Sequence, residues 1–221
     1  MFADRHAAGL ALAETVKALR LKDPLVLALP RGGVPVALPV AERLGAPLDV
    51  LLVRKIGVPG NPELAAGAVA EGADPEFNRH LLRALGLSRA DFAGDLARKR
   101  EENALRRRLY RAGRDPLPVK GRSVIVVDDG IATGATVKAA LASLAKREPA
   151  EIILAVPVAP LEAVDELSRL ADTVVCLDCS ADFRAVGVHY QDFRQVSDGE
   201  VAAALAAAEA FAPAQKKEQD R

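Results

Sequence analysis

Short apolar runs, each long enough for one buried strand, recur along this chain and constrain its fold more than any other feature. Segments with helical spacing follow most of them. Strands that are apolar on both faces and alternate with helices are typical of a parallel sheet covered on both sides. The sequence therefore predicts an α/β fold with a mostly parallel, twisted sheet flanked by helices. The runs are Leu25–Leu29, Leu48–Val53, Ser123–Val127, Glu151–Val158 and Thr173–Leu177.

Helices are expected between and around these strands, at about 4–21, 34–44, 135–146, 161–170 and 198–211. Ser197 and Glu200 have the spacing of a capping box, which predicts the start of the last helix. Pro39 is expected to kink the second helix, because proline lacks the N–H that the helix needs. The turn-rich stretch 57–62 precedes a further candidate strand at 65–70.

The length of 221 residues suits a single domain, which we place at 1–211. A helical basic insertion is expected at about 74–114, small hood elements at about 178–197, and a disordered polar tail at 212–221. Between positions 79 and 114 there are eleven Arg or Lys against four Asp or Glu. Such a run favours a solvated helix face, and a basic lid or a contact with nucleic acid or a partner subunit stays open.

The formal net charge of zero gives no global attraction to nucleic acid or to a membrane. No apolar stretch approaches the roughly 20 residues that span a bilayer. The first 20 residues carry several charges, unlike a signal peptide, so we expect a cytoplasmic protein. Two cysteines do not make a disulfide framework, and Cys176 and Cys179 are expected to be free thiols. His189 is a lone imidazole, with a general-acid role as its alternative.

The run Val124–Thr136 carries the clearest functional signal. A buried strand ends in two adjacent carboxylates, Asp128 and Asp129, and a Gly/Thr loop then leads into a helix. Ionised carboxylates only accept hydrogen bonds, which suits the vicinal hydroxyls of a ribose. Backbone N–H groups at a helix N-terminus favour a phosphate. The pattern therefore predicts a sugar-phosphate site, although each half alone is also compatible with an ordinary strand–turn–helix.

Two other phosphate-binding loops are excluded at this position. A Walker loop needs a Lys after its glycines, and none follows here. The dinucleotide-binding fingerprint has a different order of glycines, and its acid follows the turn instead of preceding it.

The run Val126–Thr136 resembles the phosphoribosyl pyrophosphate signature of type I phosphoribosyltransferases, and Ala132 makes it most similar to the adenine type. The resemblance implies that Asp128 and Asp129 hold the ribose hydroxyls. It also implies a 5′-phosphate site made by Ala132, Thr133, Gly134, Ala135 and Thr136. Hypoxanthine-type enzymes have an Asp at the position of Ala132, so that specificity is not expected.

Other segments extend the resemblance over most of 25–211. The turn at 30–33 is similar to the pyrophosphate loop of the family, and the segments 54–63 and 182–193 look like those of unassigned phosphoribosyltransferases. The resemblance implies a pyrophosphate site made by Arg31, Gly32, Gly33, Arg54 and Lys55, with Lys55 counted with the two acids as catalytic. Arg54 and Lys55 are expected at the end of the strand 48–53.

By the same resemblance the chain is an Mg²⁺-dependent transferase of nucleotide salvage. Asp128 and Asp129 would contact the metal, mostly through water. Phosphoribosyl pyrophosphate and a small nitrogenous acceptor, a nucleobase above all, are the implied substrates. The hood side chains Phe183, Tyr190 and Phe193 are candidates for stacking on the acceptor.

Two further classes of function stay open. A regulatory protein with this fold would bind phosphoribosyl pyrophosphate as an effector and contact nucleic acid or a partner through its basic helices. A repair or salvage enzyme would use the same site for hydrolysis. Nucleic acid is not favoured, because Phe92 and Tyr110 are the only aromatic residues among the arginines. No membrane partner is expected, and the sequence leaves the acceptor and a homodimer open.

Overall fold

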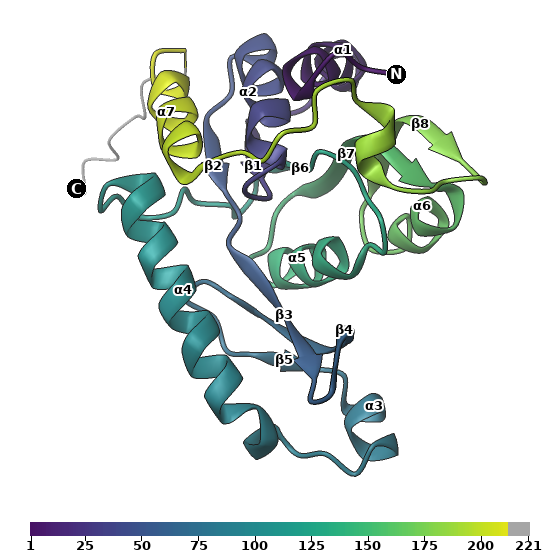
Figure 1. Ribbon diagram of the computed structural model, residues 1–221. Coiled ribbons are helices and arrows are strands. Elements are labelled where there is room, and N and C mark those ends of the chain that lie inside the picture. Colours follow the sequence, from purple (N-terminus) through teal and green to yellow (C-terminus); the bar gives the residue numbers. More distant parts are fainter. Residues whose placement is uncertain (212–221) are drawn as a thin grey trace.

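The computed structural model describes residues 1–211 and contains a central sheet of five parallel strands (Figure 1). Their order across the sheet is β2-β1-β6-β7-β8, and every neighbouring pair is parallel. The parallel α/β sheet that the sequence predicts is confirmed. The strands are β1 (Pro24–Ala28), β2 (Leu48–Val50), β6 (Ser123–Val127), β7 (Glu151–Pro160) and β8 (Thr173–Ser180).

Successive residues of β1, β6 and β7 face opposite sides of the sheet, and both sides are buried. Val26 and Ile125 pack with α1 (Arg5–Lys17), α2 (Gly33–Leu44) and α7 (Asp198–Ala208). Leu27 and Val126 pack on the other side with α5 (Ala135–Ala145) and α6 (Leu161–Leu167). Helices on both faces explain why these strands have no polar side.

The capping box at the start of α7 is confirmed. The Ser197 hydroxyl accepts from the Glu200 N–H, and the Glu200 carboxylate accepts from the Ser197 N–H. Pro39 lies inside α2, and the expected kink stays a prediction. The predicted tail at 212–221 lies outside the described residues. Within residues 1–211, no helix is long and apolar enough to cross a membrane.

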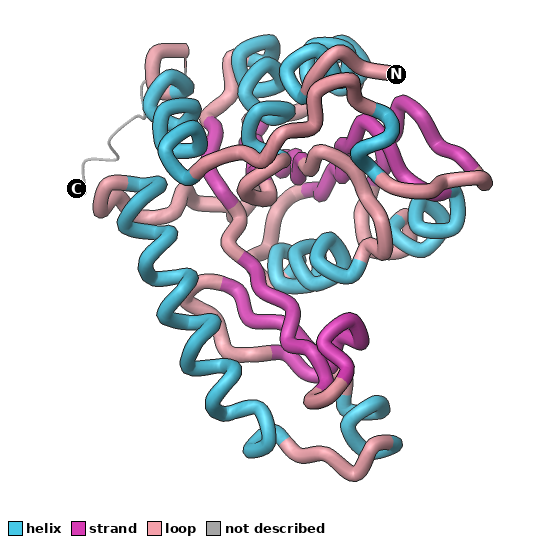
Figure 2. The backbone as a smooth tube through the Cα atoms, in the orientation of Figure 1, coloured by secondary structure: helices cyan, strands magenta, loops and turns pink. Residues whose placement is uncertain are grey.

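A second, antiparallel sheet forms an arm below the central one, with strand order β3-β4-β5 (Figure 2). Its strands are β3 (Val53–Val58), β4 (Asn61–Ala70) and β5 (Glu76–Phe77), and three helices follow: α3 (Arg79–Ala84), a 3₁₀ helix at Arg89–Phe92 and α4 (Ala93–Arg111). This sheet was not predicted as a unit, although β4 contains the predicted strand 65–70. The insertion is therefore helical only after its short first strand.

The expectation of one strand over Leu48–Val53, ending in Arg54 and Lys55, is wrong. The chain leaves the central sheet after Val50, and Val53 already belongs to β3 of the arm. Leu51 and Leu52 between them are buried as well, so the apolar run continues across the change of sheet. Arg54 and Lys55 consequently lie on the arm.

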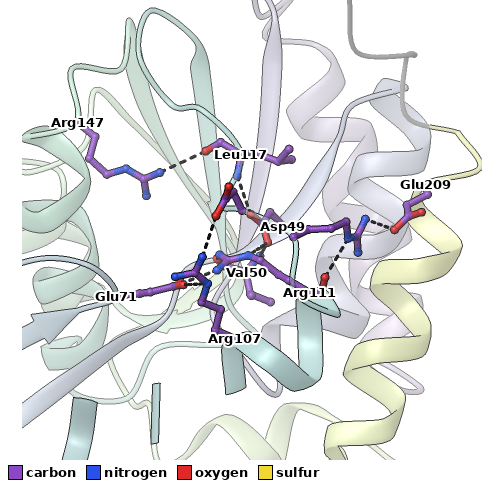
Figure 3. A network of polar contacts seen from close by, with 10 residues as sticks. Asp49, Val50, Glu71, Arg107, Arg111, Leu117, Arg147 and Glu209 are labelled. Atoms are coloured by element: carbon purple, nitrogen blue, oxygen red, sulfur yellow. Dashed lines mark hydrogen bonds and ion pairs between the residues drawn. The ribbon is translucent and has the colours of Figure 1, made fainter. Parts of the chain in front are cut away.

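A buried arginine ties the arm to the central sheet (Figure 3). Arg111, at the end of α4, contacts Asp49 of β2 at 2.7 Å and Glu71 after β4 at 2.5 Å, and it donates to the Val50 carbonyl at 2.8 Å. Asp49 also accepts from the Leu117 N–H at 3.1 Å. The side chain of Arg111 is 5% exposed. The interpretation of the basic run as a solvated face therefore fails at Arg111.

We predict that Arg111→Met lowers the free energy of unfolding by about 3–5 kcal/mol, because it leaves Asp49 and Glu71 buried without their partner. Urea unfolding measures this change. Arg108→Met is the matched control, since Arg108 is exposed on the same helix, and we expect a change within about 0.5 kcal/mol. Equal stability of the two variants would contradict the structural role of Arg111.

Candidate functional site

The loops that follow β1 and β6 meet at one edge of the central sheet. These two strands are neighbours, yet the chain continues from β1 to β2 on one side and from β6 to β7 on the other. Open α/β sheets bind ligands at such a switch point, outside the carboxyl ends of the strands. The Leu29 N–H donates to the Val127 carbonyl at 2.8 Å and holds the two strand ends together.

Glycine is required where the first loop passes the second. A Cβ atom on Gly32 would lie 2.0 Å from Oδ2 of Asp129, and one on Gly33 would lie 2.6 Å from the Val127 carbonyl oxygen. The structure thus brings the predicted pyrophosphate loop against the predicted ribose acids. The Gly33 N–H donates to the Leu29 carbonyl at 3.1 Å, so this amide is already used in starting α2.

The two acids differ in their surroundings. Oδ2 of Asp129 lies 2.7 Å from Nε of Arg5, and the Asp129 carbonyl accepts from the Tyr190 hydroxyl at 2.5 Å. Asp128 accepts from the Asp129 N–H at 2.9 Å. Burial, followed by the adjacent Asp129 carboxylate, raises the pKa of Asp128 well above its usual value. A negative charge on Asp128 beside Asp129 is therefore unfavourable in the protein alone, and a bound cation or hydrogen-bond donor would stabilise it.

The loop between β6 and α5 presents its polar groups outward. The Ile131 N–H donates to the Val158 carbonyl at 2.9 Å, which anchors the loop on β7. Thr133 and Thr136 are exposed, and Gly134 has a left-handed φ of 69° as the N-cap of α5. Among residues 1–211, no side chain caps this end of α5. The helix N-terminus therefore offers open N–H groups and positive dipole charge to an anion.

Basic residues gather near the loop that follows β1: Arg31 of that loop, Arg54 of β3 and Arg106 of α4. Arg31 lies 3.9 Å from Asp198 at the start of α7, and Asp198 also accepts a hydrogen bond from the Tyr110 hydroxyl. Arg54 lies 3.6 Å from Glu102 of α4. Burial, then the charge of Arg106, lowers the pKa of Arg54.

Lys55 is partly buried on β3 and pairs in register with Ala68 of β4. Opposed residues of an antiparallel pair share a face, and Ala68 packs in the core cluster that contains α5 residues. Lys55 therefore lies on the face of the arm that is turned toward α5, whereas Arg54 lies on the face turned toward α4.

Three residues near the loop that carries Arg31 were not predicted from the sequence as part of the site. Glu102, Arg106 and Tyr110 are four residues apart on α4, so they share one helix face, and this face meets Arg54 and Asp198. The spacing was visible in the sequence. The partners of that face were not, because they come from β3 and α7.

The predicted hood residues lie in the segment between β8 and α7, which runs beside the start of the chain (Figure 1). Tyr190 is buried, its ring 5.8 Å from that of Phe2 and 5.1 Å from that of Phe193. Phe183 stacks on His189 at 5.2 Å, and His189 contacts Asp178 at 3.2 Å. Tyr190 thus supports the Asp129 backbone from within the hood.

Cys176 and Cys179 of β8 are both free thiols, as predicted. Burial, then the neighbouring Cys179, raises the pKa of Cys176.

The paired acids fit the donor set of Mg²⁺. This ion is held in proteins by one or two carboxylates, with water and substrate phosphate supplying its other ligands. Within residues 1–211, no group of three His, Cys, Asp or Glu side chains could hold a metal alone. A metal at this edge would therefore depend on Asp128, Asp129 and a bound phosphate.

A cavity of about 530 Å³ lies apart from the acids, between α5 and the arm. Its walls are mainly apolar and include Leu64, Ala68 and Ala139. It borders the N-terminus of α5 through Ala135 but contains neither acid. The candidate site is therefore defined by the convergence of loops and charges and not by this cavity.

Comparison with known proteins identifies the class to which this fold and site belong. A family model described as phosphoribosyl transferase domain matches residues 5–192, and the chain belongs to this family. It is 47% identical over 207 residues to MT0597 and Rv0571c of Mycobacterium tuberculosis, which are provisionally named phosphoribosyl transferases. The match covers 93% of this chain and 46% of each relative, so the chain spans about half their length.

Solved structures share the fold. The crystal structure of TT1426 from Thermus thermophilus has a TM-score of 0.84 and 45% identity, and the match covers 96% of this chain and 100% of that one. The protein AQ2163 of Aquifex aeolicus has a TM-score of 0.50 at 14% identity, covering 91% of this chain and 86% of that one, and shares the fold alone. The type I phosphoribosyltransferase resemblance of the sequence is thereby confirmed.

We predict that Gly33→Ala lowers the free energy of unfolding by about 1–3 kcal/mol, because its Cβ would press on the backbone of β6. Urea unfolding of the purified variant measures the loss. Gly94→Ala is the control: within residues 1–211, its added Cβ meets nothing within 4 Å apart from its chain neighbours and the backbone of its own helix. Alanine in a helix stabilises by up to about 1 kcal/mol over glycine. A Gly33→Ala protein as stable as the parent would contradict the close approach of the two loops.

Proposed function

We propose that this chain is an Mg²⁺-dependent phosphoribosyltransferase that moves the phosphoribosyl group of phosphoribosyl pyrophosphate to a nitrogenous acceptor, a nucleobase, and releases pyrophosphate. One observation carries the proposal. Two acids at the tip of β6 lie directly against the loop that carries Arg31, and the loop that follows these acids leads to the uncapped N-terminus of α5.

The substrate sugar phosphate binds along the loop from β6 to α5. Asp128 and Asp129 accept hydrogen bonds from the ribose hydroxyls. The 5′-phosphate binds at the N-terminus of α5, where amides of residues 132–136 and the hydroxyls of Thr133 and Thr136 donate to its oxygens. The exposure of both threonines supports this assignment.

The leaving pyrophosphate lies on the side of the arginines. Arg31 binds it bidentately, and the Gly32 amide donates from the loop. Arg54 adds positive charge from the α4 face of β3, and Lys55 adds it from the opposite, α5 face. Bound Mg²⁺ would neutralise charge that develops on the leaving group. Since positive charge grows on the ribose in an oxocarbenium-like transition state, the paired acids stabilise it and no protein nucleophile is needed.

The acceptor enters from the hood. Phe193 is 37% exposed and Phe183 lies in the same segment, so these rings are the candidates for stacking on a base, while Tyr190 is buried and supports the loop. Ala132 supplies no carboxylate beside the acceptor, which argues against hypoxanthine-type recognition. The cytoplasmic location and a homodimer stay predictions.

The alternative of a nucleic-acid-binding regulator is weaker. Several arginines of the basic segment pair with acids: Arg98 with Asp95 at 2.5 Å and Arg107 with Asp115 at 2.8 Å. Arg111 is buried between two more acids. These pairs reduce the positive charge that the helix offers to a phosphate backbone.

Asp128→Asn tests the proposal. We expect the affinity for phosphoribosyl pyrophosphate with Mg²⁺ to drop roughly tenfold or more, because a hydrogen bond to a charged group contributes about 1.5–3 kcal/mol. Titration calorimetry measures binding, and release of pyrophosphate with a panel of nucleobases measures turnover. Asp165→Asn, an exposed acid on α6, should bind as the parent does. Unchanged affinity in Asp128→Asn would remove the assignment.

A further inference from the structure

Arg5 reaches the signature acids from the start of the chain. Its Nε atom lies 2.7 Å from Oδ2 of Asp129, and Nη1 donates to the Arg194 carbonyl at 2.8 Å. The guanidinium carbon lies 3.9 Å from the centroid of the Phe193 ring. The side chains of Arg5 and Asp129 are 11% and 15% exposed. No sequence motif singles out Arg5, because its partners are more than 100 residues away.

These contacts fix the Asp129 side chain in one place. Arg5 holds one carboxylate oxygen, Tyr190 holds the backbone carbonyl, and the missing side chain of Gly32 leaves just enough space for the carboxylate. A carboxylate has two oxygens with about four lone-pair sites. With Oδ2 committed to Arg5, Oδ1 is still an acceptor for a ligand.

The charges at the strand tip also support a role for Arg5 in placing Asp129. Asp128 and Asp129 are adjacent and largely buried, so two negative charges repel each other at the strand tip. The Arg5 guanidinium compensates one of them at hydrogen-bond distance. It also covers Phe193, so one side chain contacts both the acid that faces the sugar and an aromatic ring of the hood.

Docking of helix α1 does not explain this arrangement. Leu12, Ala13 and Val16 already bury the helix against α2 and the sheet. Glu14 and Arg43 add an exposed ion pair between the two helices at 2.5 Å. A buried ion pair contributes little net stability because both charges lose water. The pair between Arg5 and Asp129 is therefore better explained by what it does to the acid.

We propose that Arg5 is a positioning residue that acts through Asp129. It fixes the second acid in the orientation that receives the vicinal hydroxyls of a phosphorylated ribose, and it links that acid to the hood. This inference rests on the proposed function and adds a residue from the first helix to the sugar site.

The test compares a ligand that carries the hydroxyls with one that lacks them. Phosphoribosyl pyrophosphate with Mg²⁺ requires the acids, whereas inorganic phosphate at millimolar concentration requires only the N-terminus of α5. We expect Arg5→Ala to bind the first roughly tenfold more weakly, a loss common for groups that orient a ligand-binding side chain. The affinity for phosphate, measured by NMR titration, should stay within about twofold of that of the parent, since the α5 N-terminus keeps its amides.

Two further variants separate positioning from support of the fold. Arg5→Lys keeps the charge but loses the planar fork that contacts Asp129 and Arg194 together, so its affinity should lie between those of Arg5→Ala and the parent. Arg43→Ala removes the other ion pair of α1 and should bind both ligands normally. If urea titration shows that Arg5→Ala is unfolded, Arg5→Lys is used in its place. For Arg5→Lys we expect weaker binding of phosphoribosyl pyrophosphate and normal binding of phosphate.

Equal losses for both ligands would show a general structural role and overturn the proposal, as would unchanged affinity in Arg5→Ala. If the parent itself does not bind phosphoribosyl pyrophosphate, the proposed function fails first. The two failures are therefore distinguishable in one set of titrations.

Discussion

The parallel pairing of β1 with β6 is the constraint on which the rest of this structure depends. The register sets Ala28 opposite Val127, so both strands end at the same level. Each strand is followed by a loop that leads into a helix, and the two loops pack against each other. Glycines at 32 and 33 make that contact possible. The acids lie against the loop that carries Arg31 because of this one pairing, and the N-terminus of α5 follows a few residues after them.

The parts of the fold that the sequence predicts well carry local signals. The β6–α5 unit has a fully apolar strand, two acids and a Gly/Thr loop in one stretch, and its observed bounds lie within a residue of those predicted. The start of α7 is marked by a capping box of two residues three apart. Both signals are complete within a few positions, so no tertiary information is needed to read them.

The parts of the fold that were not predicted depend on contacts between residues far apart in the chain. The arm sheet was missed because Leu51 and Leu52 are as buried as the strands on either side, which hides the change of sheet. Arg111 looked like one more charge in a basic helix until Asp49 and Glu71 were placed around it. Hydrophobic periodicity reports which face is buried, and it does not report which charges meet there.

Arg5 and Arg111 both form buried Arg–Asp ion pairs, but the surroundings of the two pairs give them different roles. Arg111 is enclosed by two acids and a carbonyl between the central sheet and the arm, so its bonds hold parts of the chain together. Arg5 contacts a single acid at a strand tip, where the second oxygen of that acid is still able to accept a bond. Since burying either guanidinium costs solvation, each is explained by the geometry it fixes. In Arg111 that geometry is the attachment of the arm, and in Arg5 it is the orientation of an acid at the tip of β6.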